Sequence, residues 1–297
     1  MLDRTGVLWD SLSMNKLPTK QRAQILGMMV EGMAIRAISR MTGASKNTIV
    51  KLLADAGAAC LAYQDAHLRN LPCKRLQLDE IWSFNYCKQA TVANARNAPE
   101  GAGDVWTWTA IDADTKLVPS WYIGRRDSEA AIEFICDLKQ RLAKRVQITS
   151  DGHKAYLKGM EAAFGGQVDY AILTKIYGPG IEGARRYSPP QIVGIETQCC
   201  SGIPDMEHVS TSFVERQNLT MRMGMRRFTR LTNAFSKKIE NHEYAIAIYF
   251  MHYNFVRIHQ TLKISPAMAA GVTGKLWSLE DIVAIADEYE VAQKQAA

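Results

Sequence analysis

The stretch KRLQLDEIWSFNY (Lys74–Tyr86) predicts a β-strand with a carboxylate, Asp79, near its middle. Its apolar and polar residues alternate well enough for a strand, in which successive side chains point to opposite faces of the sheet. Asp79 and Glu80 are therefore expected on opposite faces, so that only one of them can join a given cluster of acids. The rest of the predicted fold is built outward from this strand.

The patterns that follow this strand predict a mixed α/β sheet. Residues 104–124 are predicted as two strands joined by a tight turn, and residues 127–143 as an amphipathic helix. A short buried strand at 146–152 and a fifth strand at 168–175 follow. With a helix before the fifth strand, the order is β-β-β-α-β-α-β, followed by a long helical region over residues 212–255 with breaks near Gly224 and Asn233. This order predicts a ribonuclease-H-like fold, a mixed sheet flanked by helices.

Three acidic residues are candidates for one site: Asp79, Asp151 and Glu215. Asp151 ends the fourth strand, and ligands of open α/β sheets collect at the carboxyl ends of the parallel strands. Glu215 lies in the first turn of the last predicted helix, and Asn218 and Arg222 project from about the same side. Each acid also has a structural alternative, which is a surface position for Asp79, a turn before glycine for Asp151 and a helix-capping box for Glu215.

Residues 15–57 predict a helix-turn-helix DNA-binding module. Three apolar stripes with helical spacing follow Pro18, and Gly32 and Gly43 end the first two. The exposed residues at the start of the third helix would enter the major groove, and they are Ser45, Lys46, Asn47, Thr48 and Lys51. The alternative is an unrelated three-helix docking module. Residues 58–72 are predicted as a helical linker and residues 266–297 as a C-terminal helical tail.

The net charge of +6 is concentrated in two segments. Residues 16–56 hold seven Lys and Arg against two acids, and residues 216–263 hold nine against two. Concentrated positive charge indicates a polyanionic partner such as double-stranded DNA, although two solvated helix faces would give the same count. The candidate phosphate contacts of the second segment are Arg222, Arg226, Arg227, Arg230, Lys237 and Lys238.

Other classes of protein fit the sequence poorly. The longest apolar stretch, residues 244–255, is well short of the ~20 residues that a membrane span needs. The first residues lack the pattern of a secretory signal, and the six cysteines form no CxxC pair. We therefore expect a cytoplasmic protein with reduced thiols and no membrane partner.

Five runs of sequence carry a resemblance to a known family. LDEIWSF, WTWTAIDADTK, ITSDGHKAY, STSFVERQNLTMRM and RRFTRLTNAFSKK resemble the DDE transposases of bacterial insertion sequences, specifically the insertion-sequence-one family. The resemblance implies a ribonuclease-H-like catalytic domain over residues 73–265, with the acidic triad at Asp79, Asp151 and Glu215. It also implies a helix-turn-helix that recognises terminal inverted repeats, at least a dimer on DNA, and a nucleoid-associated bacterial protein. The cysteine-rich finger that some members carry before the helix-turn-helix is absent from this sequence.

The implied chemistry requires divalent cations. Three carboxylates brought together repel each other unless a cation neutralises them, and hard oxygen ligands select Mg²⁺ or Mn²⁺. Two ions would act on either side of the phosphorus, with Asp79 bridging both and Asp151 and Glu215 each ligating mainly one. By resemblance, the same site cuts the element ends and joins them to target DNA. A ribonuclease-H-type nuclease and a catalytically silent DNA-binding regulator remain the alternatives.

Overall fold

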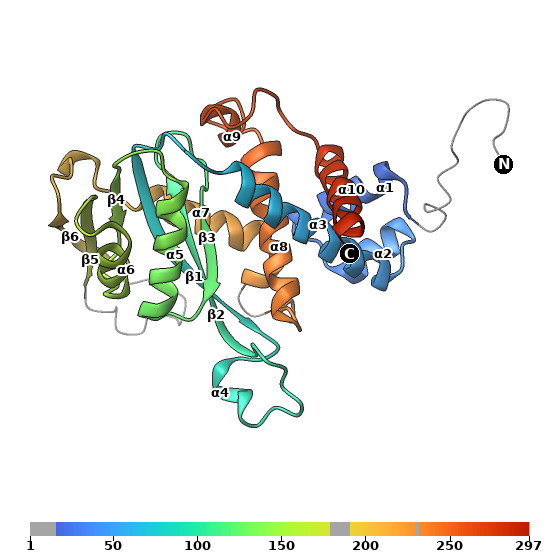
Figure 1. Cartoon of the computed structure of the whole chain (residues 1–297). Helices are drawn as coiled ribbons and strands as arrows, with labels where there is room; N and C mark the ends of the chain where they lie inside the picture. Colours follow the sequence, from blue (N-terminus) through green and yellow to red (C-terminus); the bar gives the residue numbers. More distant parts are fainter. Residues whose placement is uncertain (1–15, 179–190, 230–231, 297) are drawn as a thin grey trace.

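The computed structural model describes residues 16–178, 191–229 and 232–296 (Figure 1). The centre of the fold is a six-stranded sheet in the order β3-β2-β1-β4-β5-β6. The strands are β1 Arg75–Asn85, β2 Gly103–Asp112, β3 Trp121–Gly124, β4 Gln147–Ser150, β5 Asp169–Tyr177 and β6 Ile192–Ser201. β1 is parallel to β4 and β4 to β5, whereas the β1–β2, β2–β3 and β5–β6 pairs are antiparallel.

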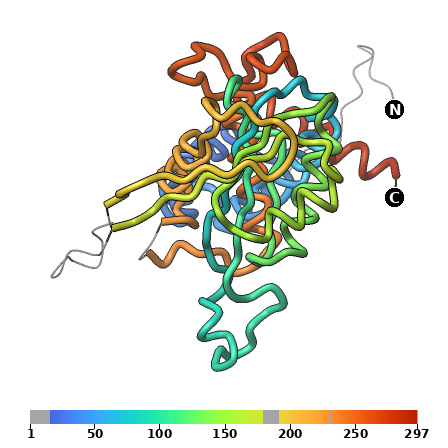
Figure 2. The backbone as a smooth tube through the Cα atoms, turned by 90° about the vertical axis from the view of Figure 1, so that its left-hand side faces the viewer, coloured from blue at the N-terminus to red at the C-terminus, as the bar shows by residue number. Residues whose placement is uncertain are grey.

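The first five strands have the order and directions of a ribonuclease-H-like sheet, so the predicted fold class is confirmed. β6 was not predicted and lies between the fifth predicted strand and the last predicted helix. Most residues of β6 are exposed, so neither face of the strand is marked by a row of buried apolar residues. Figure 2 shows β5 and β6 as a ribbon that projects from the body of the molecule.

Helices cover both faces of the sheet (Figure 1). On one face lie α5 Ser128–Arg141 and α6 Ala155–Phe164, and on the other lies α7 Ser212–Gly224. The last helical region breaks between Gly224 and Ile239, as expected, and continues as α8 Ile239–Met251 and a π-helical turn, His252–Val256. Short helical turns complete this part: α4 Gln89–Val92, η1 Met206–His208, η2 Arg226–Phe228 and α9 Pro266–Ala269.

Three consecutive helices occupy the segment in which a helix-turn-helix was predicted. They are α1 Thr19–Val30, α2 Ile35–Thr42 and α3 Lys46–His67. Gly43 adopts φ 73° between α2 and α3, a conformation that glycine adopts without strain. The Ser45 side chain accepts a hydrogen bond of 3.1 Å from the backbone N–H of Thr48 and so caps α3.

α3 continues past the expected module boundary. Residue 57 falls inside this helix, and residues 58–67, which were predicted as a helical linker, form its second half. The reason is close packing on α8, because a Cβ atom added to Gly57 would lie 2.2 Å from the Cβ of Tyr244. Gln64 also donates a hydrogen bond of 3.1 Å to the carbonyl oxygen of Ala247 in α8. The N-terminal helices are therefore fixed to the sheet domain through α8.

The last helix, α10 Leu279–Ala296, lies in the segment predicted as a helical tail and packs against α1 and α3. Arg22 of α1 binds both carboxylate oxygens of Asp287 in α10, at 2.6 and 2.8 Å. None of the helices in the described part of the chain is long and apolar enough to cross a membrane.

Candidate active site

The end of the β1–β4 ladder positions the two candidate aspartates. The last paired residues of these parallel strands are Gln77 and Thr149. Two residues further along each strand direction stand Asp79 and Asp151, so the register brings them to the same level. Asp151 follows directly after β4, at the carboxyl edge of the sheet, where the sequence predicted a binding site.

Asp79, Glu80 and Asp151 form an acidic cluster. Each offers one carboxylate oxygen, and the three oxygens lie within 4.8 Å of one another. The expectation that Asp79 and Glu80 cannot join one cluster is therefore wrong. Both residues are still paired with β2, so strand parity holds there, but the β1–β4 ladder ends at Gln77 and Thr149, and beyond this level the longer Glu80 side chain can approach Asp151.

Glu80 is held in this position by two donors. Arg126, in the segment between β3 and α5, donates from Nε to Glu80 Oε1 at 2.7 Å. The buried Tyr156 hydroxyl of α6 donates to Glu80 Oε2 at 2.8 Å. Because the Glu80 side chain is only 1% exposed, these two bonds compensate for much of the cost of its burial.

Asp79 has the most perturbed carboxylate of the cluster. Its burial, together with the nearby charges of Glu80 and Asp151, raises its pKa to about 7. Two hydrogen bonds oppose this shift, one from the Glu80 backbone N–H at 2.9 Å and one from the side-chain amide of Asn218 at 2.8 Å. A cation placed among these oxygens would remove the repulsion that raises this pKa.

Helix α7 is docked onto β1 by side chains on the Asp79 face of the strand. Gln77 Oε1 accepts hydrogen bonds from the backbone N–H groups of Phe213 and Val214, at 2.7 and 3.2 Å. These are N–H groups of the first helical turn, which have no partner within the helix. One turn further on, Asn218 reaches Asp79. The contacts fix α7 so that Glu215, in its first turn, faces the same side of the sheet.

Glu215 lines the same cavity as the two aspartates, but its carboxylate forms an ion pair with a lysine side chain. Lys175 of β5 contacts a Glu215 carboxylate oxygen at 2.5 Å, and Thr211 donates to Glu215 Oε1 at 2.7 Å. Among the described residues, Glu215 is not part of the group formed by the other acids. The capping box with Ser212 is not formed, because Thr211 is the N-cap and makes no side-chain cap bond.

One cavity of about 750 Å³ contains all three residues of the predicted triad. Its charged lining residues are Asp79, Asp151, Glu215, Arg126, Lys154 and Lys175. The three carboxylates come from β1, from the end of β4 and from α7. The sequence prediction therefore placed all three acids at one cavity, although only the two aspartates lie in the close cluster.

The donor atoms of this cavity fit a divalent cation such as Mg²⁺ or Mn²⁺. They are carboxylate oxygens, the hard ligands that these ions prefer. Asn218 lies behind Asp79, outside the cavity lining, and its side-chain oxygen is buried without a hydrogen-bond partner in the described part of the chain. Asp79, Asp151 and Glu215 would hold the ions, with Glu80 adjacent.

Comparisons with known proteins give matches among solved structures. No family model matches the chain, and no curated protein matches it. The chain is similar to piggyBac transposase in a synaptic complex with hairpin DNA, with 11% identity, 90% of this chain and 69% of that chain covered, and a TM-score of 0.39. It is also similar to Mos1 transposase in a paired-end complex with the left transposon end, with 10% identity, 55% and 62% covered, and a TM-score of 0.24.

These likenesses are too distant to assign an activity. The strand order and the geometry of the acids have to support any functional statement about this chain.

The predicted DNA-reading residues lie at the start of α3. Ser45, Lys46, Asn47 and Lys51 are exposed, whereas Thr48 is half-buried and takes part in the cap. Lys51 forms an ion pair of 2.5 Å with Asp55, one turn further along the exposed side of the helix. The arrangement leaves Lys46 and Asn47 with exposed side chains at the N-terminal end of the helix.

The basic residues of the second segment differ in exposure. Arg226, Lys237 and Lys238 are exposed, and Arg222 is half-buried in α7. Arg227 is turned inward, because its Nε donates to Ser236 Oγ at 2.7 Å and its burial lowers its pKa to about 10. Arg227 is engaged with Ser236 in this conformation, and its contact with phosphate stays a prediction. Arg230 lies outside the described residues.

Sequence reasoning missed Glu80 of the acidic cluster and two cavity-lining residues that bind carboxylates, Arg126 and Lys175. Glu80 had been excluded by strand parity. The signals for the other two were weak, because Arg126 follows a short strand and Lys175 is a single lysine near the end of β5. Only the tertiary structure brings them to the carboxylates.

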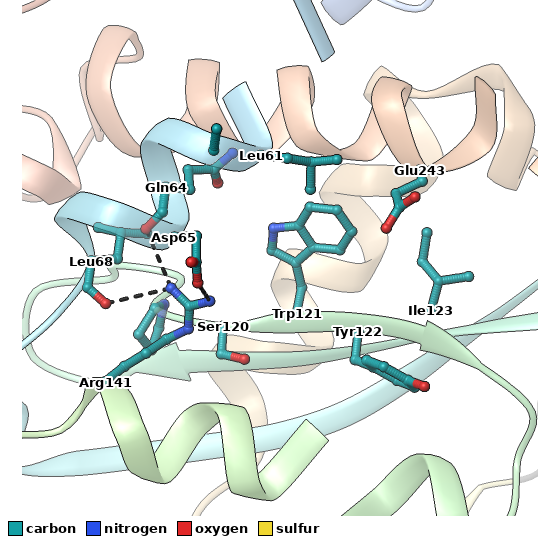
Figure 3. Close-up of a pocket in the computed structure, with 12 residues that line it drawn as sticks. Leu61, Gln64, Asp65, Leu68, Ser120, Trp121, Tyr122, Ile123, Arg141 and Glu243 are labelled. Carbon is teal, nitrogen blue, oxygen red and sulfur yellow. Dashed lines mark hydrogen bonds and ion pairs between the residues drawn. The ribbon is translucent and has the colours of Figure 1, made fainter. Parts of the chain in front are cut away.

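A second cavity, of about 410 Å³, lies where α3 and α8 pass over β3 (Figure 3). Arg141 of α5 lies at its edge and donates to the carbonyl oxygens of Gln64 and Leu68 at 3.3 and 3.4 Å. Arg141 also binds Asp65 at 3.0 Å, so its guanidinium is engaged in holding α3 to the sheet domain. No group of three potential metal ligands is found there among the described residues.

Proposed function

We propose that this chain is a transposase of a bacterial insertion sequence, of the insertion-sequence-one type. It would bind the terminal inverted repeats of its element, cleave the element ends and join them to target DNA. The observation that carries this proposal is the single cavity lined by Asp79, Asp151 and Glu215 at the carboxyl edge of a ribonuclease-H-like sheet. The helix-turn-helix arrangement of α1 to α3 supports a DNA substrate.

In this proposal the three acids are metal ligands. Bound Mg²⁺ or Mn²⁺ ions would supply activation of the attacking oxygen and stabilisation of the leaving oxygen during phosphoryl transfer. Asp79 is central, since it lies between the Asp151 side of the cavity and helix α7, to which Asn218 connects it. Glu80, Arg126 and Tyr156 fix the other side of the cluster.

Two surfaces would hold the DNA. Lys46 and Asn47 of α3 would contact base edges in the major groove, supported by Ser45 and Lys51. Arg226, Lys237 and Lys238 would contact phosphates, which adds affinity without reading sequence. The protein would act on two DNA ends and therefore as a dimer or larger assembly, in the cytoplasm and associated with the nucleoid.

A second candidate is a DNA-binding regulator without catalytic activity. One observation favours it: Glu215 is paired with Lys175 instead of lying in the acidic cluster. In that case the acids would be structural, and α3 alone would carry the function. A nuclease that cuts RNA–DNA hybrids would share the acids but would not require the DNA-reading helix.

The test is an in vitro reaction on a supercoiled plasmid that carries the gene with its native flanking DNA. The wild type with Mg²⁺ is expected to nick or cut at the element ends and to join these ends to a second plasmid. Asp79→Asn, Asp151→Asn and Glu215→Gln should each abolish both steps. Glu207→Gln is the matched control, since Glu207 is exposed on η1 and lies outside the cavity lining.

Each alternative has its own outcome in this assay. Full activity in one of the three variants would remove that residue from the metal site. Hydrolysis of RNA–DNA hybrids without joining of DNA ends would identify a nuclease. Specific binding of the element ends without cleavage or joining, by folded wild-type protein, would identify a regulator.

A further inference from the structure

Lys175 occupies the position next to Glu215 that a metal ion would need. Its ammonium nitrogen lies 2.5 Å from both carboxylate oxygens of Glu215. Thr211 donates to one of these oxygens as well. A divalent cation ligated by Glu215 would have to approach the same oxygens, so the ammonium and the cation compete for one carboxylate.

The Lys175–Glu215 pair is poorly suited to stabilise the fold. The Lys175 side chain is 23% exposed and the Glu215 side chain 42% exposed. Ion pairs with this much contact with water add little to folding stability. α7 is already docked to β1 by Gln77 and Asn218, without help from Lys175.

The cavity offers room for the pair to open. It has a volume of about 750 Å³, and both Lys175 and Glu215 line it. A lysine ammonium is a compact charge on a flexible four-carbon chain, so it can change partner without a movement of β5. Asp79 and Asp151 line the same cavity, so an opened Glu215 has two further carboxylates nearby.

We propose that Lys175 is an exchangeable counter-ion that holds Glu215 in the metal-free protein and releases it when a divalent cation binds. Lys175 is then a positioning residue of the metal site, because it acts on the cation through Glu215. This inference rests on the proposed function, since it takes Glu215 as a metal ligand. It adds a residue from β5 that competes with the metal.

The experiment measures binding of Mn²⁺ to the full chain without DNA, by electron paramagnetic resonance of the free ion. Removing the competitor in Lys175→Met should tighten Mn²⁺ binding, by about two- to fivefold given the modest coupling of exposed pairs. Lys154→Met is the matched control, because Lys154 lines the same cavity and is exposed. Lys154→Met also removes one positive charge from the cavity but leaves the Lys175–Glu215 pair in place, so we expect a smaller increase in Mn²⁺ affinity. Lys175→Arg, which keeps a competing cation, should bind like the wild type.

The link to Glu215 is tested in a second background. Glu215→Gln should weaken Mn²⁺ binding. In this variant, adding Lys175→Met should increase Mn²⁺ affinity no more than adding Lys154→Met does. Thermal unfolding of each variant establishes that the chain is folded. The inference is overturned if Lys175→Met and Lys154→Met bind Mn²⁺ equally, or if the gain persists without the Glu215 carboxylate.

The two levels of failure give different results. Saturable Mn²⁺ binding by the wild type with no effect specific to Lys175→Met overturns this inference and leaves the proposed metal site intact. Absence of saturable binding in both the wild type and Lys175→Met overturns the proposed metal site, and this inference with it.

Discussion

The side-chain amide of Asn218 donates a hydrogen bond of 2.8 Å to Asp79 Oδ2, and this bond connects helix α7 to the central strand β1. It fixes one oxygen of Asp79, whose carboxylate lies close to those of Glu80 and Asp151. The Asn218 side-chain oxygen is buried without a partner, so the amide is oriented by this single contact among the described residues. Asn218 therefore orients the Asp79 carboxylate within the site.

Asn218→Ala is expected to reduce Mn²⁺ affinity and end cleavage by about 10- to 100-fold, as loss of a partner behind a metal ligand does. Binding of the element ends should change little, because α3 is untouched. Mn²⁺ titration and the cleavage assay measure the two effects. Asn94→Ala, at an exposed position, is the control. Equal metal affinity in both variants would contradict the role given to Asn218.

The raised pKa of Asp79 predicts that metal-free protein loses stability as pH rises. The pKa is about 7 in the folded chain, above the ordinary value of an aspartate. Between about pH 4 and 7 the unfolded chain releases this proton while the folded chain keeps it, so the free energy of unfolding falls by at most ~1.4 kcal/mol per pH unit. Asp79→Asn should remove this contribution.

Urea unfolding at pH 4.5 and 7.5 in the presence of a chelator measures this difference. The decrease in the free energy of unfolding from pH 4.5 to pH 7.5 should be smaller in Asp79→Asn than in the wild type. Adding Mg²⁺ should stabilise the wild type more at pH 7.5, where a larger fraction of Asp79 is ionised. The same pH dependence in both proteins would show that Asp79 does not titrate in this range.

Tyr156→Phe is predicted to destabilise the protein by ~1–3 kcal/mol, because it leaves a buried oxygen of Glu80 without its donor. Chemical denaturation measures the change. Tyr289→Phe on α10 serves as the control, since Tyr289 is only half-buried. In Tyr156→Phe combined with Glu80→Gln the loss should be smaller than the sum of the single effects. Additive losses would show that the two residues act independently.

Asn47→Ala is expected to weaken binding of the element ends by ~1–3 kcal/mol and to leave binding of unrelated duplex unchanged, as loss of a base contact does. Lys237→Gln should instead weaken both and reduce the salt dependence by about one phosphate contact. Fluorescence anisotropy with the two duplexes at several salt concentrations separates the effects. A uniform loss in Asn47→Ala would place this residue on the DNA backbone.

Gly57→Ala tests the packing of α3 on α8. The added Cβ would lie 2.2 Å from the Cβ of Tyr244, and overpacking of this kind costs ~1–3 kcal/mol. Gly274→Ala is the control, because its added Cβ meets no atom within 4 Å among the described residues. Thermal unfolding should show a lower midpoint for Gly57→Ala only. An unchanged midpoint would mean that α3 and α8 are held less closely than the structure shows.

The sequence predicted the order of the first five strands because each has apolar residues that match a strand period and turn signals around it. It predicted Asp79 and Asp151 as neighbours, since both follow from strand positions. It missed β6, whose residues are mostly exposed. It excluded Glu80, because parity gives the face of a side chain and not how far the side chain reaches beyond the end of the β1–β4 ladder.

The charges of the site were harder to predict than its position. A count of basic residues includes Arg227, although its guanidinium is turned inward. It gives no reason to single out Lys175, which reaches Glu215 only because β5 and α7 meet at the same edge. Partners of this kind depend on tertiary contacts between segments that are distant in the chain.

The packing of α10 against α1 and α3 affects how the protein can be made. Arg22 and Asp287 are bound to each other across nearly the whole length of the polypeptide. During translation, α1 to α3 emerge from the ribosome first, but their apolar faces lack this cover until residues 279–296 have also emerged. A nascent chain would therefore complete the packing of α1 to α3 only after the segments that carry Asp79, Asp151 and Glu215 have been synthesised.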